Sequence, residues 1–167
     1  MTDEDYTMEV MQFLKEQHTK PKKPHKAPYK KPDSVKVLED EWYAYKQRQH
    51  PSNPAVIKNK LRDDTANGIT ECVMTWLKLH GCFAARVNTT GIYSVKLGRY
   101  IRGGSTKGMA DVSAVVNGRS VQVEVKAGRD KPRPEQLKVK QQVEAAGGVY
   151  LFVHSLDDFL TQIKTIL

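Results

Sequence analysis

Two acidic residues and a lysine are spaced around a predicted hairpin in a way that suggests phosphate chemistry. Asn117-Gly118 is the strongest short signal for a two-residue turn, because both turn positions need a positive φ, and valine-rich runs flank it. Antiparallel partners then step away from the turn together, which places Asp111 directly opposite Glu124. Lys126 follows on the same face, because side chains alternate along a strand.

Two opposed carboxylates would have Cβ atoms roughly 5 Å apart and would repel by roughly 3 kcal/mol at an effective dielectric constant of about 20. A divalent cation between the two carboxylates turns this repulsion into a net attraction, because hard cations such as Mg²⁺ bind carboxylate oxygens. The ammonium of Lys126 projects toward the same place, where it could hold an attacking water or stabilise charge on a phosphate. The alternative is a half-exposed sheet face that carries ordinary charges.

The two faces of this hairpin differ in polarity. Ser113 and Gln122 share the polar face with the two carboxylates and the lysine. The opposite face is predicted to be core and carries Ala110, Val112, Ala114, Val121, Val123 and Val125.

Composition narrows the classes of protein. The chain has 167 residues, 27 Lys and Arg against 19 Asp and Glu, and a net charge of +8, which favours polyanionic partners, with nucleic acid first. No run approaches the roughly 18 apolar residues of a membrane span. The acidic start, Met-Thr-Asp-Glu-Asp, lacks the features of a secretory signal, so we expect a cytoplasmic protein. Two cysteines, Cys72 and Cys82, are expected to be reduced thiols.

Residues 1–66 are predicted to form an N-terminal extension. A proline- and lysine-rich segment at about residues 20–36 is typical of an extended linker, either a solvated spacer or a basic arm that binds phosphates. Short helices are expected on both sides of it, around Tyr6–Leu14 and around Val37–Tyr45.

Residues 67–167 are predicted to form one α/β domain. The order is helix, strand, small hairpin, two strands, helix, strand and helix, which gives a central mixed sheet with helices on both sides. The expected elements are a helix at about 66–80, a strand at 82–87, a small hairpin within 91–107, the hairpin around Asn117-Gly118, a helix at Glu135–Ala146, a strand at Val149–Val153 and a helix at Leu156–Ile166 with Ser155 as its N-cap.

The order of these motifs resembles the VRR-NUC branch of the PD-(D/E)XK nuclease superfamily, which is related to Holliday-junction resolvases. The motifs that carry the resemblance are Glu71 in the first helix, Gly108-Met-Ala-Asp111, Glu124-Val125-Lys126, and Glu135-Gln136 at the start of the next helix. Ala110 stands where the family has a proline. The resemblance implies a restriction-endonuclease-like αβββαβ core over residues 67–167.

The resemblance also implies Mg²⁺-dependent hydrolysis of DNA phosphodiesters, with Mn²⁺ as a substitute. Asp111, Glu124 and the Val125 carbonyl would bind the metal, and Lys126 would be the catalytic lysine. Glu71 and Gln136 would support the metal or the scissile phosphate. Without such a role, Glu71 is a solvated helix residue and Gln136 is an ordinary first-turn residue.

Basic residues flank the predicted site in two loops. They are either DNA-binding residues on both sides of the phosphate backbone or parts of solvated loops, and they comprise Arg99, Arg102, Lys107, Arg129, Lys131 and Arg133. Tyr93 and Tyr100 either stack on an unpaired base or pack on the small hairpin.

We therefore expect a metal-dependent endonuclease, selective for branched, flap or junction DNA, in repair, recombination or phage replication. A homodimer would suit symmetric cutting, and the aromatic cluster Trp42, Tyr43 and Tyr45 could form its interface. The alternative is a DNA-binding module that has the nuclease fold but does not cut.

Overall fold

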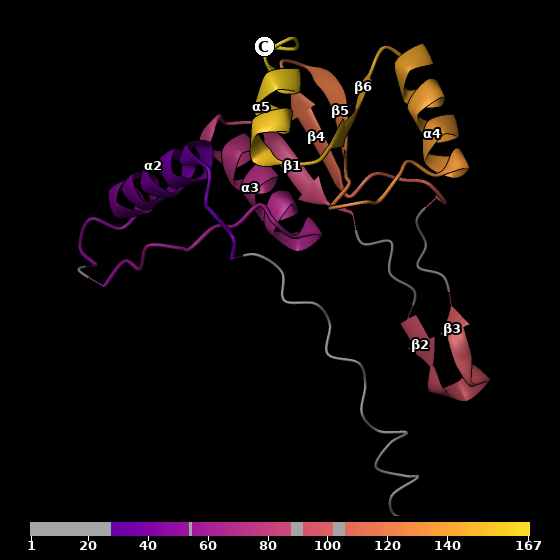
Figure 1. Ribbon diagram of the computed structural model, residues 1–167, viewed down its shortest axis with the longest axis horizontal. Helices are drawn as coiled ribbons and strands as arrows, with labels where there is room; N and C mark the ends of the chain where they lie inside the picture. Colours follow the sequence, from indigo (N-terminus) through magenta and orange to yellow (C-terminus); the bar gives the residue numbers. More distant parts are fainter. Residues whose placement is uncertain (1–27, 54, 88–91, 102–105) are drawn as a thin grey trace, which may run out of the picture.

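A four-stranded mixed sheet forms the centre of the computed structural model, which describes residues 28–53, 55–87, 92–101 and 106–167. The predicted helix around Tyr6–Leu14 and the first part of the linker lie outside the described residues. The strand order is β1-β4-β5-β6 (Figure 1), with bounds β1 (Phe83–Arg86), β4 (Val112–Val116), β5 (Arg119–Val125) and β6 (Val149–Val153). This confirms the mixed α/β class.

Helices cover both faces of the sheet. One face packs against α3 and α5, with α2 beside them, and the other packs against α4 (Figure 1). The helices of the described residues are α2 (Asp33–Gln49), α3 (Ala66–Leu79), α4 (Pro134–Ala145) and α5 (Leu156–Ile163). A separate two-stranded sheet consists of β2 (Ile92–Ser94) and β3 (Arg99–Ile101). The 3-10 turn η1 (Val95–Leu97) connects these two strands. Within the described ranges, no helix has the length and apolarity needed to cross a bilayer.

The hairpin around Asn117-Gly118 has the predicted register. Val116 pairs with Arg119, and the antiparallel ladder continues to Val112 and Val123. Asn117 and Gly118 both have positive φ, 48° and 77°, as such a turn requires. β5 then pairs in parallel with β6, so α4 is the crossover connection that parallel strands need.

Most of the core lies between the sheet and the helices α2, α3 and α5. The valines predicted for the core face of the hairpin are there, and Trp76 joins them. Val35, Leu38 and Leu61, from the segment predicted as an N-terminal extension, are buried in the same core. A smaller cluster under α4 contains Ala110, Val139 and Tyr150, among other residues.

Three expectations need correction. Ala110 was predicted for the main core face but packs in the cluster under α4, because the chain leaves the ladder before it reaches Ala110. The linker was predicted to extend to residue 36, but α2 begins at Asp33. The last helix ends at Ile163 and continues only as a turn to residue 166, although Ser155 is the N-cap as predicted, with its side chain accepting from the Asp158 N–H.

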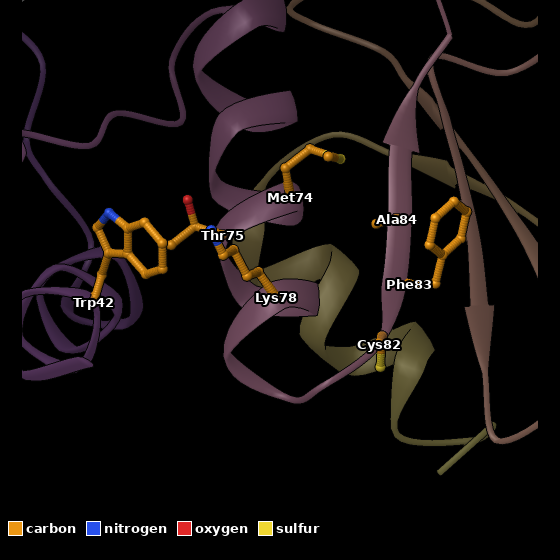
Figure 2. Close-up of a pocket in the computed structure, with 7 residues that line it drawn as sticks. All are labelled: Trp42, Met74, Thr75, Lys78, Cys82, Phe83 and Ala84. Carbon is orange, nitrogen blue, oxygen red and sulfur yellow. The ribbon is translucent and has the colours of Figure 1, made fainter. Parts of the chain in front are cut away.

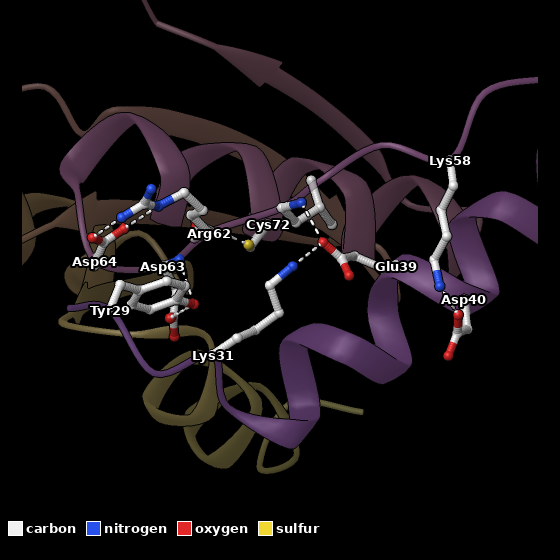
Figure 3. Close-up of polar contacts among 10 residues, drawn as sticks. Tyr29, Lys31, Glu39, Asp40, Lys58, Arg62, Asp63, Asp64 and Cys72 are labelled. Carbon is white, nitrogen blue, oxygen red and sulfur yellow. Dashed lines mark hydrogen bonds and ion pairs between the residues drawn. The ribbon is translucent and has the colours of Figure 1, made fainter.

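The segment before α2 is held against the domain by buried acidic groups (Figure 3). Asp63 accepts hydrogen bonds from the Tyr29 hydroxyl at 2.7 Å and from the Leu156 N–H at the start of α5 at 3.2 Å. Glu39 accepts from the Leu61 N–H at 2.6 Å and pairs with Lys31. These contacts connect four distant parts of the chain, so this segment belongs to the folded unit.

The bond between Tyr29 and Asp63 leads to a prediction about alkaline stability. Burial and Asp63 raise the pKa of Tyr29 from 10.0 to about 12, so the folded protein favours the neutral phenol. The stabilisation is complete below pH 10 and is lost as the pH rises to about 12. Tyr29→Phe is expected to cost about 1 kcal/mol near pH 8.

Urea unfolding of both proteins, near pH 8 and near pH 11, measures this difference. The gap between wild type and Tyr29→Phe should narrow at the higher pH. A gap that stays constant would contradict the assignment.

Candidate active site

Asp111 lies where β1, β4 and β5 meet, one residue before β4 begins. Its carbonyl oxygen accepts from the Val87 N–H at 2.8 Å, at the end of β1. Its carboxylate oxygen Oδ2 accepts from the Val125 N–H at 2.9 Å. In a continued ladder that N–H would bond to the carbonyl of Ala110, so the Asp111 side chain takes the place of the next backbone partner. Asp111 and Glu124 are therefore neighbours, although the ladder ends one pair before them.

Glu124, Lys126 and Gln136 form a buried hydrogen-bonded network. The Lys126 ammonium is fully buried and lies 3.0 Å from Glu124 Oε1, 2.9 Å from Gln136 Oε1 and 3.2 Å from Asp130 Oδ2. The Gln136 amide nitrogen donates to the same Glu124 oxygen. The structure thus brings together three of the predicted residues around one carboxylate oxygen.

Gln136 is the residue through which α4 is attached to this network. Besides accepting from Lys126, its Oε1 accepts from the Arg133 N–H at 2.9 Å, in the first turn of α4. Two donors on the oxygen and one acceptor on the nitrogen leave only one orientation of the amide that satisfies every partner. Gln136 is therefore more than an ordinary first-turn residue, because its side chain fixes both charged groups.

Burial and charge oppose each other at Glu124. Its pKa is raised, first by burial and further by the negative charge of Asp111, whereas Lys126 and Gln136 lower it. A buried ammonium is stable only when it is paired, and Glu124 and Asp130 provide that pairing for Lys126. The site therefore holds three acidic groups and one cation. Glu124 and Lys126 are buried, so electrostatic effects between them are larger than in water.

The segment before Asp111 passes close to the first turn of α4. Gly108 has φ +87°, and a Cβ atom there would lie 2.5 Å from the Glu135 carbonyl oxygen. Lys107 forms an ion pair with Glu135, and the Gly108 carbonyl accepts from the Tyr150 hydroxyl at 3.3 Å. Only glycine fits this approach, which explains the glycine three residues before Asp111.

Other predicted residues lie apart from the network. Glu71 is exposed on α3, on the opposite side of the sheet from α4. The hydrogen-bond and ion-pair partners of Asp111 and Lys126 among the described residues do not include it. Arg102 lies outside the described residues. Of the remaining basic residues, Lys107 is paired as above, and the exposed ones in the loops and on β3 are Arg99, Arg129, Lys131 and Arg133.

Two residues of the site were not predicted. Asp130 bonds to the Lys126 ammonium from the loop before α4, and His154 Nδ1 lies 2.9 Å from the Lys126 carbonyl oxygen. The only sequence signal for Asp130 is its place as the one acidic residue of the basic run from residue 126 to 133. His154 has no signal, because its position follows from the pairing of β6 with β5.

No known family model, curated protein or solved structure matches this chain.

The donor atoms present suit a hard divalent cation. No group of three or more His, Cys, Asp or Glu side chains in a metal-binding arrangement occurs within the described part of the chain. Asp111 and Glu124 nevertheless provide two neighbouring carboxylates. The N–H of Val125 points toward Asp111, and in a strand the C=O of a residue points to the same side as its N–H. Two carboxylates and a carbonyl form an all-oxygen set, and Mg²⁺ completes such sets with water.

A separate cavity lies away from these groups. Its volume is about 340 Å³, and its lining comes from α2, α3 and the outer edge of β1 (Figure 2). Trp42 stacks on Tyr45 with ring centroids 5.3 Å apart, and the Lys78 ammonium lies 5.2 Å from the Trp42 ring centroid. Trp42 is thus already packed within the monomer.

Proposed function

We propose that this protein is a magnesium-dependent DNA endonuclease that acts on branched, flap or junction DNA. The observation that carries the proposal is the neighbouring pair of carboxylates, Asp111 and Glu124, with the buried ammonium of Lys126 bonded to one of them. A fold selected for stability alone gains little from a buried ion pair beside a second negative charge. A buried, ion-paired carboxyl group with a raised pKa, such as Glu124, is typical of functional sites.

The topology supports the same proposal. The order α3, β1, β4, β5, α4 and β6 gives a helix, an antiparallel set of three strands, a crossover helix and a parallel strand. This arrangement is compatible with a restriction-endonuclease-like αβββαβ core. The carboxylates lie at the point where the antiparallel strands end and the crossover begins.

Each residue has a distinct task in the proposed reaction. Asp111, Glu124 and the Val125 carbonyl would hold Mg²⁺, which when bound polarises the scissile phosphate and lowers the pKa of a water. The three N–H donors of Lys126 are engaged by Glu124, Gln136 and Asp130. Lys126 therefore acts through its positive charge, which stabilises the negative charge that develops on the phosphate. Gln136 and Asp130 position the Lys126 ammonium through their hydrogen bonds. The exposed arginines and lysines of the adjoining loops bind the phosphate backbone.

Cleavage assays test the proposal. Labelled duplex, 5′ flap, splayed-arm and four-way-junction DNA are each incubated with the protein and Mg²⁺, Mn²⁺ or EDTA. We expect cutting with either metal, none with EDTA, and a preference for the branched substrates.

Binding without cutting under every metal would contradict the proposal and would leave a DNA-binding module with this fold. Equal cutting of all four substrates would retain the nuclease but remove the proposed selectivity. The Lys126→Met protein, purified in parallel, excludes a contaminating nuclease.

A further inference from the structure

The chain between Val87 and Asp111 is an insertion whose two ends meet at the candidate site. Val87 and Asp111 are joined by the backbone hydrogen bond described above, at the junction of β1 and β4. Everything between them, residues 88–110, leaves and returns at this one place. The β2 and β3 hairpin lies within the insertion and stands apart from the four-stranded sheet (Figure 1).

The hairpin displays two aromatic rings outside any core. Tyr93 and Tyr100 are direct cross-strand partners, and their ring centroids are 5.2 Å apart with an interplanar angle of 67°. Their exposed fractions are 51% and 74%. The tip adds Val95 and Leu97, which are 88% and 55% exposed. Such a cluster of exposed apolar groups on a small projection is typical of a contact surface.

The charge of the insertion indicates what this surface contacts. Residues 88–110 contain no aspartate or glutamate, and the acid-free run begins as early as residue 72. The basic residues of the insertion are Lys96, Arg99, Arg102 and Lys107. Lys96 and Arg99 are exposed on the hairpin itself, and neither forms an ion pair with a described residue. Aromatic rings interleaved with unpaired cations are the recognition surface for unpaired nucleotides, because bases stack on the rings and phosphates contact the cations.

We infer that the β2 and β3 hairpin binds unpaired nucleotides next to the cleaved phosphate, and so selects DNA with a single-stranded segment at that place. This inference rests on the proposed nuclease function for its location, but the binding itself requires no cutting. Tyr93 is six residues after Val87, a distance of at most roughly 20 Å for an extended chain. That reach corresponds to roughly six nucleotides at about 3.4 Å each, the spacing of a duplex strand, and to fewer in an extended single strand. A strand bound at Asp111 would therefore lie within range of the two rings.

Binding measurements in EDTA test this inference without cleavage. The probes are a fluorescein-labelled oligothymidine and a duplex of the same length. The variant Tyr93→Ala/Tyr100→Ala is expected to bind the oligothymidine about tenfold or more weakly than wild type does. Its affinity for the duplex should change less than about twofold, because paired bases have no free faces to stack.

Three further variants separate the effects of stacking, structure and charge. Tyr93→Phe/Tyr100→Phe keeps both rings and should bind the oligothymidine within about twofold of wild type. Phe83→Ala removes an aromatic that is 68% exposed on β1, away from the hairpin, and should leave both affinities unchanged. Lys96→Gln/Arg99→Gln should weaken binding to both probes and reduce the dependence on salt.

A second readout locates the contact directly. An oligothymidine that carries 5-iodouracil should cross-link to the peptide containing Tyr93 or Tyr100 on irradiation. Equal losses on both probes in the double alanine variant, no loss on either probe, or cross-links only outside residues 92–101 would each overturn the inference. Cross-links only outside residues 92–101, together with no loss of affinity for either probe, would leave the rings as a surface for a protein partner.

The measurements distinguish failure of the nuclease proposal from failure of the hairpin inference. A protein that cuts nothing but shows the selective loss for oligothymidine retains the hairpin inference and loses the catalytic one. A protein that cuts with Mg²⁺ while the tyrosine variants bind like wild type loses only the hairpin inference.

Discussion

Lys126→Met is expected to lower the rate of DNA hydrolysis by about a hundredfold or more. The ammonium is fully buried and bonded to Glu124, Asp130 and Gln136, so its position is set before any substrate binds. Methionine has a similar length, but it carries no charge and donates no hydrogen bond. The buried carboxylate of Glu124 then loses its cation. The proposed reaction therefore loses the group that stabilises charge on the phosphate.

Single-turnover cleavage of the preferred substrate with saturating Mg²⁺ measures this effect. Lys138→Met is the matched control, since Lys138 is an exposed lysine of α4, and it should cut at nearly the wild-type rate. Thermal unfolding of both variants checks that the fold is retained. Cutting at the wild-type rate by a folded Lys126→Met protein would remove the lysine from the mechanism.

Asp111→Asn is expected to reduce the affinity for Mg²⁺ and to slow cleavage by about a hundredfold or more. The substitution keeps the shape of the side chain, and the amide oxygen can still accept from the Val125 N–H, as the carboxylate oxygen does. The fold should therefore remain while one of the two negative charges is lost.

Calorimetric titration with Mg²⁺ or Mn²⁺ reads the metal affinity apart from catalysis. Asp157→Asn provides the control, because Asp157 is an exposed aspartate in the first turn of α5. Metal binding by Asp111→Asn with the wild-type affinity would show that the cation is held elsewhere.

Local signals were sufficient to predict the hairpin that carries most of the site. The Asn117-Gly118 turn determines which residues pair across β4 and β5, and the alternation of valines determines which face is buried. The prediction was wrong only where the ladder ends. A side chain replaces a backbone partner there, so Asp111 does not sit in a regular pair and Ala110 lies in the other layer.

Local signals did not predict that the helix α4 packs over the polar face of the sheet. Gln122, Glu124 and Lys126 lie on the face predicted to be polar, and all three are buried. The helix α4 contacts Glu124 and Lys126 through Gln136. It has a weak apolar pattern and buries only Gln136 and Val139 of its own residues. A helix that docks through hydrogen bonds to buried charges leaves little hydrophobic periodicity in the sequence.

Long-range contacts account for the remaining difference. Val35, Leu38 and Leu61 complete the main core from a segment that looks like a polar extension. Asp63 and Glu39 hold that segment in place by accepting hydrogen bonds from the Tyr29 hydroxyl and the Leu61 N–H, which are distant from them in the chain. No local pattern specifies such partners, because they depend on which surfaces meet after the sheet and helices have formed.

The insertion between Val87 and Asp111 also bears on how such a protein can evolve. The insertion begins and ends at a single backbone pair, and only its last residues, from Lys107 to Ala110, pack against α4 or the core. The part before Lys107 can therefore change in length and sequence without moving a strand of the central sheet. Specificity commonly resides in loops held by a rigid scaffold. Under the proposed function, exchange of this part of the segment between related chains would alter which nucleic acids are recognised, while the proposed catalytic groups would be inherited unchanged.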